Sequence, residues 1–336
     1  MIKKVGIGLV VCSFLSLSIL HVYAQTISNP VSILSSATDI TTIPSVPGPN
    51  QTVTASIDSS SADLENSIIT WSINGQKMRS GKGLKEFTFT NGGLGTKTTI
   101  TALIQAPEGT ITKTLNFNPS DVDLLTEGRG YVPPFYKGRT QWGYQTQISI
   151  VALPHILDSS GKEISAQNLI FKWSKDDTVL GTVSGIGRSS LTLSDSVLSL
   201  PMDIKLQIYT DKDTVVAEKT LSLGPVPQQT LVYEDNPLYG YMFHYAINGE
   251  YPLREKEVSF SAFPLFFSTL TKNSPLVLYD WSTNGTFGGQ TTNRVTFRAP
   301  ESAGTASVGI DIKHKTKFTE STSKSFGVQF GNQNNF

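Results

Sequence analysis

Cysteine is almost absent from this sequence, which has a single residue of that type, Cys12, among 336. Cys12 lies in the N-terminal apolar run from Val5 to Leu20. A chain that loses this run has no disulfide and no thiol chemistry, so burial of apolar side chains must stabilise it. About 310 residues then remain, which exceeds one ordinary core and predicts two or three domains.

The N-terminus has the pattern of a cleavable signal peptide. Lys3 and Lys4 precede the apolar run, and Ala24 stands where a signal peptidase reads small residues, so we expect a mature chain that begins at Gln25. Two alternatives are weaker. Lipid attachment to Cys12 would need small residues before it, and a membrane anchor would need a run of roughly 20 apolar residues.

The sequence also lacks an excess of positive or negative charge. Lys plus Arg and Asp plus Glu number 27 each, and without residues 1–24 the totals are 25 and 27, a net charge of −2. This balance gives no basic patch for nucleic acid or an anionic membrane. We expect no nucleic-acid partner and no membrane span in the mature chain.

Patterns for catalysis and metal binding are missing as well. The four histidines are scattered without metal-ligand spacing, and we expect them at the surface or in joints. Residues 181–185 lack the helix that follows a nucleophile elbow, and residues 185–189 lack the strand-to-helix setting of a phosphate loop. Calcium between domains stays open, with Asp121, Asp123, Asp211 and Asp213 as candidate oxygen ligands. We expect no enzyme and no cofactor.

What the sequence does contain is a threefold repeat centred on tryptophan. Trp71, Trp173 and Trp281 are 102 and 108 residues apart, each with an apolar residue two positions earlier. Because alternate side chains share one face of a strand, each Trp is predicted to be a core residue. An apolar-Thr-apolar triplet follows 14 to 18 residues later, and a strand opening with Lys follows after 42 to 46.

Turn residues divide these segments into strands of 5 to 8 residues. Asn74-Gly75 and Asn284-Gly285 follow two of the Trp strands and predict type I′ hairpin turns, whereas Asp176-Asp177 in the middle copy tolerates a looser turn. The fold class is therefore all-β, with three tandem antiparallel β-sandwiches.

The motif Trp-Ser-x-Asn-Gly, at 71–75 and 281–285, resembles that of bacterial immunoglobulin-like and PKD-like domains. The resemblance covers about 80 to 90 residues in each copy and implies an exported bacterial protein built from tandem sandwiches. The expected divisions are a signal peptide (1–24), a flexible leader rich in Pro, Ser and Thr (25–45), domain 1 (46–125), an aromatic joint (126–141), domain 2 (142–228), a second aromatic joint (229–250), domain 3 (251–331) and a tail (332–336).

Both joints carry many large aromatic side chains, unlike flexible linkers. They are interpreted first as rigid joints buried between domains, and alternatively as a platform that binds a glycan or protein. The candidate binding residues are Tyr131, Phe135, Tyr136, Trp142, Tyr239 and Tyr241.

The function expected from these observations is that of a non-catalytic surface or extracellular protein, periplasmic in a cell with an outer membrane. It would act as a rigid spacer, an adhesion module or a protein-interaction module, with an undetermined protein or glycan as partner. Two alternatives stay open: a carbohydrate-binding accessory module, and a structural component of a pilus or cell-envelope assembly, which requires an open strand edge.

Overall fold

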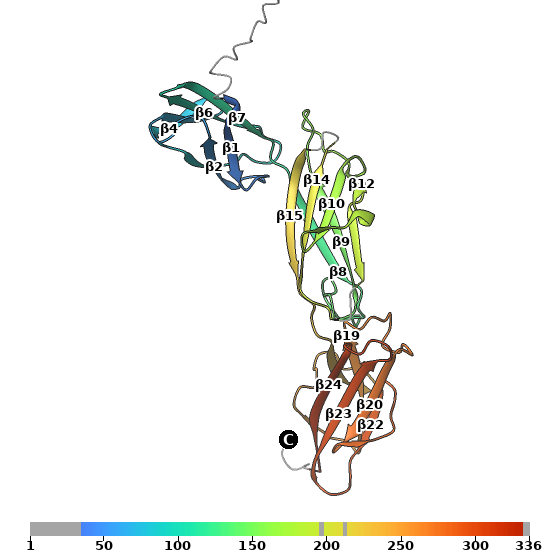
Figure 1. The fold of residues 1–336 in the computed structure, drawn as a ribbon. Helices are drawn as coiled ribbons and strands as arrows, with labels where there is room; N and C mark the ends of the chain where they lie inside the picture. The colour runs from blue at the N-terminus through green and yellow to red at the C-terminus, as the bar shows by residue number, and fades with distance from the viewer. Residues whose placement is uncertain (1–34, 195–197, 211–213, 332–336) are drawn as a thin grey trace, which may run out of the picture.

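The computed structural model describes residues 35–194, 198–210 and 214–331, and it consists of three antiparallel β-sandwiches in chain order (Figure 1). The expected signal peptide and the tail lie outside the described residues, as do Asp211 and Asp213. No helix within the described ranges is long and apolar enough to cross a membrane.

The first sandwich packs a three-stranded sheet against a four-stranded one. The strands of the smaller sheet are, in spatial order, β1 (Thr38–Ile43), β2 (Thr52–Ser59) and β5 (Glu86–Thr90). Those of the larger are β4 (Gln76–Lys82), β3 (Ile68–Ile73), β6 (Thr98–Ala106) and β7 (Gly109–Phe117). In immunoglobulin notation these orders are A-B-E and C′-C-F-G.

The second sandwich repeats this topology. Its smaller sheet is β13 (Ser190–Ser194), β9 (Gln147–His155) and β8 (Asp121–Gly128). Its larger sheet is β11 (Thr178–Val179), β10 (Ile170–Lys175), β14 (Met202–Tyr209) and β15 (Val215–Leu223), with β12 (Gly185–Ile186) also paired to β10. Two short 3₁₀ turns, Ala166–Asn168 and Gly181–Val183, flank β10 and β11.

The third sandwich adds two short strands to the same plan. One sheet is β17 (Gly240–Tyr241), β16 (Gln229–Asn236), β19 (Glu257–Leu265) and β22 (Arg294–Arg298). The other is β18 (Glu250–Pro252), β24 (Ser321–Phe330), β23 (Gly304–His314), β20 (Val277–Thr283) and β21 (Thr286–Phe287), in which β18 runs parallel to β24.

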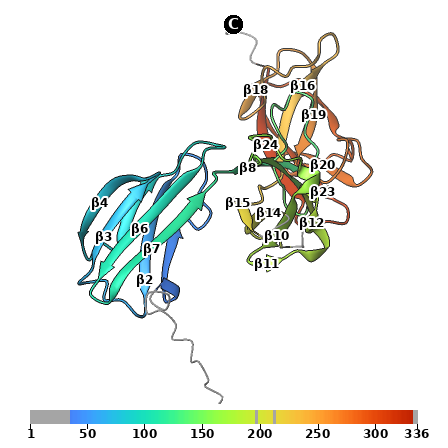
Figure 2. The ribbon, with the colours of Figure 1, turned by 90° about the horizontal axis from the view of Figure 1, so that it is seen from above.

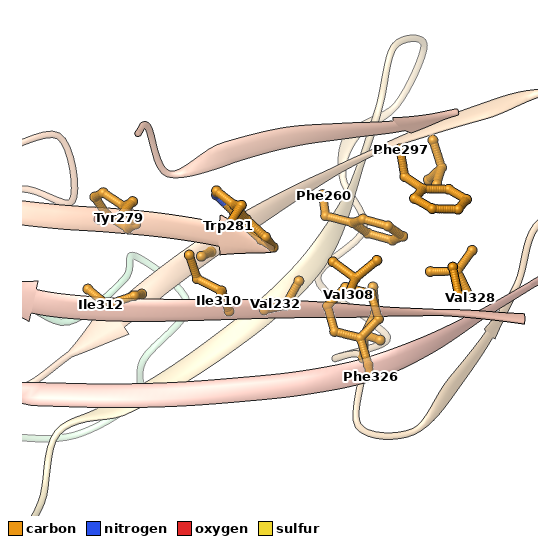
Figure 3. Packing of buried hydrophobic residues seen from close by; sticks show 14 of the residues in the cluster. Val232, Phe260, Tyr279, Trp281, Phe297, Val308, Ile310, Ile312, Phe326 and Val328 are labelled. Carbon is orange, nitrogen blue, oxygen red and sulfur yellow. The ribbon is translucent and has the colours of Figure 1, made fainter. Parts of the chain in front are cut away.

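The repeated sequence segments fall on equivalent strands. The tryptophans lie on β3, β10 and β20, each at most 1% exposed, and each indole Nε1 donates a hydrogen bond to a backbone carbonyl. Figure 3 shows Trp281 among Phe260, Val308 and Ile310, which come from both sheets of the third sandwich. The fold is thus three tandem immunoglobulin-like sandwiches, each with its own core.

The turn of the middle copy has the same backbone geometry as that of the first copy. Asp176 and Asp177 both have positive φ, 46° and 62°, as do Asn74 and Gly75 at 49° and 82°. The Asp176 carboxylate accepts a hydrogen bond from the Asp203 amide, as the Asn74 side chain does from Thr99. Asp176-Asp177 therefore forms the same kind of turn as Asn74-Gly75, because the Asp carboxylate accepts this hydrogen bond as the Asn amide oxygen does.

The strand pairing also places the domain boundaries at other residues than the sequence analysis predicts. Residues 38–43 of the expected leader form β1, which pairs with β2 along its whole length. The division at 125 would cut β8, which pairs with β9 and so belongs to the second sandwich. Residues 229–236 of the second expected joint form β16, which pairs with β19 in the third. These segments belong to the sheets because their backbone N–H and C=O groups pair with neighbouring strands.

The connections between sandwiches differ in kind. Three residues, 118–120, join β7 to β8. Between the second and third sandwiches lie segment 129–146 and the short crossing 224–228, and these two sandwiches lie end to end, with the first to one side (Figures 1 and 2).

Candidate binding surface at the second junction

The six candidate residues separate into three environments. Trp142 is 4% exposed and belongs to the core of the second sandwich, where its Nε1 donates to the Thr146 carbonyl at 3.1 Å. Tyr131, Phe135 and Tyr136 are half-buried at the second junction. Tyr239 and Tyr241, on the turn and strand after β16, are 77% and 39% exposed. Burial removes Trp142 from any surface that a partner can reach.

Five rings from three segments form what we term the aromatic cluster: Phe135, Tyr233, Tyr241, Phe243 and Phe263. Phe135 comes from the segment between β8 and β9 of the second sandwich, yet its ring lies 4.5 Å from Phe243 and 5.8 Å from Phe263 in the third. Tyr241 meets Phe263 edge to face at 5.1 Å. Such geometry adds about 0.5–1.5 kcal/mol per pair beyond area burial, so the cluster fastens segment 129–146 to β16 and β19.

A lysine completes one side of the aromatic cluster. Lys272 Nζ lies 3.9 Å from the Phe263 ring centroid and 4.2 Å from that of Tyr241, and it donates to the Tyr241 hydroxyl at 3.0 Å. A cation over two ring faces is held by the ring quadrupoles. Tyr241 and Phe243 remain 39% and 40% exposed. The cluster therefore presents apolar ring surface beside the positive charge of Lys272.

Backbone hydrogen bonds join the two sandwiches beneath the cluster. Tyr131 N donates to Phe267 O at 2.6 Å, and Phe266 N donates to Tyr131 O at 2.7 Å. Phe266 is buried with φ of +65°, a conformation that a bulky residue adopts only when its surroundings impose it. A Cβ on Gly130 would lie 2.7 Å from Phe266 Cα, so only glycine permits this approach.

Gln145 makes the second set of contacts across the junction. Its side-chain carbonyl accepts from Thr319 Oγ1 at 2.6 Å and Thr319 N at 3.2 Å. Its backbone carbonyl accepts from Lys317 Nζ at 2.5 Å, and its amide donates to Ser199 Oγ. Gln228 adds a third bridge, because its Nε2 donates to the carbonyls of Tyr144 and Phe266.

A surface hollow of about 660 Å³ opens on the third sandwich near the end of β16. Its lining includes Glu234, Asp235, Arg294 and Tyr245, of which Tyr245 is 52% exposed. The polar groups are largely paired: Glu234 accepts from the Tyr251 hydroxyl at 2.7 Å, and Arg294 Nε lies 3.2 Å from Asp235. An exposed ring beside paired carboxylates and a guanidinium suits a ligand with many hydroxyl groups.

Two of the candidate calcium ligands, Asp121 and Asp123, lie beside basic side chains. Asp123 lies 3.2 Å from His155 Nε2, and Asp121 lies 3.7 Å from Lys219 Nζ. Across the part of the chain that the structure describes, no group of three His, Cys, Asp or Glu side chains is placed to hold a metal ion.

Sequence reasoning missed Gln145, Phe263, Lys272 and Thr319. For Phe263 there was a signal, since residues 262–267 are almost continuously apolar and a strand covered on one face alone would alternate. Their burial in β19 and the following turn reflects the aromatic cluster on the outer face of the sheet. Gln145 and Thr319 are 174 residues apart, and neither lies in a recognisable motif.

No protein-family model and no curated protein sequence matches the chain. Several solved tandem-domain structures are similar to it. Fibronectin(III)-like modules of Clostridium thermocellum CbhA are 13% identical over 56% of this chain and 94% of theirs, with a TM-score of 0.26. Three N-terminal domains of the bacteriophage RB49 outer capsid protein Hoc are 9% identical over 88% and 99%, with a TM-score of 0.26.

The central fibronectin-III array of RIM-binding protein is 11% identical, covering 85% of this chain and 94% of that one, with a TM-score of 0.30. At such scores the fold assignment rests on the strand pairing of this chain itself.

Proposed function

We propose that the protein is a non-catalytic, exported spacer and interaction module, in which the second and third sandwiches form one rigid unit. The observation that carries the proposal is the set of hydrogen bonds at the second junction, above all those of Gln145 and Tyr131. Interfaces between domains in one chain ordinarily permit motion, and a network of directional bonds opposes it.

In this proposal the aromatic cluster has two roles. Its buried rings hold the junction, whereas the exposed edges of Tyr241 and Phe243 offer a partner apolar area beside Lys272. Aromatic residues anchored on a rigid support lose little conformational entropy on binding, which is why they are enriched among hot spots. The location would be the cell surface, the extracellular medium or a periplasm.

The rigid unit can be tested by pulsed electron–electron double resonance, which measures the distance between two spin labels. The measurement uses the full chain with Cys12→Ser. Spin labels go at Met78, Val151 and Leu278, half-exposed sites on one sandwich each. We expect one narrow distance distribution between labels at Val151 and Leu278. The Met78 and Val151 pair, which spans the three-residue connection, provides the comparison. A broad distribution for Val151 and Leu278 would contradict the rigid unit.

Export has its own test. Expression in a bacterial host followed by N-terminal sequencing of the released protein should give Gln25 as the first residue. Retention of residues 1–24 on a protein that stays in the cytoplasm would exclude the proposed location.

A second candidate function is carbohydrate binding, favoured by the exposure of Tyr239 and Tyr245 and by the hollow beside Tyr245. Glycan-array binding of the full chain should then fall with Tyr245→Ala and with Tyr239→Ala. Ile186→Ala removes an apolar side chain from the second sandwich whose exposure, 70%, lies between those of the two tyrosines, and it serves as the control. Binding that is equal in all three variants would place the glycan site elsewhere, and no binding by the parent chain would exclude this function.

A further inference from the structure

The turn between β23 and β24 in the third sandwich, residues 315–320, reaches the second sandwich and is here termed the latch loop. Lys317 and Thr319 of this loop make the contacts to Gln145. The conformation of the latch loop therefore decides whether these bonds across the junction can form.

His314, at the base of the latch loop, accepts hydrogen bonds from the backbone of this loop. It is 6% exposed, and its Nδ1 accepts hydrogen bonds from the backbone amides of Thr316 at 3.2 Å and Lys317 at 3.1 Å. Two amides that donate to Nδ1 require an unprotonated nitrogen there, so the ring is neutral and its proton lies on Nε2. An imidazolium would direct an N–H at both amides and break both hydrogen bonds.

The groups around His314 act on the charge of its ring in opposite directions. Glu320 is fully buried, and its Oε2 accepts from the Ser268 amide at 2.9 Å while its Oε1 lies 3.4 Å from Lys317 Nζ. Three atoms here are buried without a hydrogen-bond partner: His314 Nε2, Glu320 Oε1 and Ser268 Oγ.

The facing residue on β20 is the apolar Val277, and the flanking Lys313 and Lys315 are exposed. Burial lowers the pKa of His314 below 6.5; the nearby Glu320 carboxylate opposes this effect and Lys317 adds to it.

We propose that protonation of His314 opens the latch loop and frees Lys317 and Thr319 from Gln145, so that mild acid loosens the joint between the second and third sandwiches. The joined state holds His314 neutral, so its stabilisation is complete above pH 6.5 and is lost as pH falls through the lowered pKa. This pH response rests on the proposed rigid unit, whose joint it would regulate.

The test repeats the Val151 and Leu278 distance measurement on the full chain from about pH 7.5 to about pH 4.5, across the range in which histidine titrates. We expect the narrow peak at the upper end and its loss toward the lower end. A broad distribution at every pH would contradict the rigid unit itself, whereas a narrow peak at every pH would overturn only the pH response.

Two variants assign the titrating group. His314→Gln keeps an acceptor oxygen for the two amides but does not titrate, so its narrow peak should persist in acid. Glu320→Gln should retain the acid response. A response that persists in His314→Gln overturns the proposal, as does one that disappears only in Glu320→Gln.

Nuclear magnetic resonance titration of the unaltered chain gives a readout that does not depend on the folding of a variant. The His314 ring signals should titrate with the same midpoint as the loss of the distance peak. Titration of His314 without a change in distance would overturn the proposal.

Discussion

Gln145 and Thr319 lie on different sandwiches, and the Gln145 side-chain carbonyl accepts both the hydroxyl and the amide hydrogen of Thr319, at 2.6 and 3.2 Å. One side chain thereby satisfies two donors of a turn that belongs to another domain. The same residue holds Lys317 and Ser199 through its backbone, so a single position links three loops.

Gln145→Ala should loosen the second junction while each sandwich remains folded. The loss of two hydrogen bonds that leaves Thr319 unpaired costs about 1–3 kcal/mol of docking free energy. The Val151 and Leu278 distance distribution should broaden at neutral pH. Gln141→Ala, an exposed glutamine four positions earlier, is the control and should leave the distribution unchanged.

Gly130→Ala should disturb the same junction by a steric route. The added Cβ would lie 2.7 Å from Phe266 Cα and 2.8 Å from its carbonyl carbon, contacts that require backbone to move. We expect a broadened distance distribution and faster amide exchange at Tyr131 and Phe266. Gly181→Ala, where a Cβ meets nothing within 4 Å, should alter neither.

Trp281→Ala should destabilise the third sandwich by about 3–5 kcal/mol, since it leaves a cavity in the core. Trp281→Phe fills part of that space but leaves the Thr292 carbonyl without the indole donor that it meets at 2.9 Å, and it should cost less. Urea unfolding followed by resolved amide signals of the third sandwich measures both. Equal stability of Trp281→Ala and the parent chain would contradict the central position of this residue.

Asp177→Gly should stabilise the second sandwich by up to about 1 kcal/mol, because glycine adopts a φ of +62° without the Cβ contact that aspartate has there. The reciprocal change, Gly75→Asp, should destabilise the first sandwich by a similar amount, since Gly75 holds the equivalent turn position with φ of +82°. Thermal unfolding of the two variants against the parent chain checks both signs.

Tyrosine ionisation provides a pH prediction. Burial, with a smaller effect of Tyr241, raises the pKa of Tyr131 to about 12, and burial also raises the pKa of Tyr279 above its ordinary value. A raised folded-state pKa means stabilisation that is present below pH 10 and lost as pH rises toward 12. Absorbance titration at alkaline pH should show tyrosine side chains that ionise only well above pH 10, and Tyr131→Phe should remove one of them. An unchanged late phase in Tyr131→Phe would contradict this assignment.

The sequence by itself determined the number of sandwiches and the strands that carry their cores. Trp71, Trp173 and Trp281 each have an apolar residue two positions earlier, and this alternation is a local property that reports which strand face is buried. The Asn-Gly pairs determined their turns for a similarly local reason, since few residues adopt two successive positive φ angles.

Tertiary structure alone decided the boundaries and the surface. Whether residues 38–43 or 229–236 lie free or join a sheet depends on a partner strand elsewhere in the chain, which composition does not reveal. Trp142 and Tyr239 are both aromatic candidate binding residues in the sequence, yet Trp142 is 4% exposed and Tyr239 is 77% exposed. The bond between Gln145 and Thr319 spans 174 residues, so only the packing of one sandwich on the next brings its donor and acceptor together.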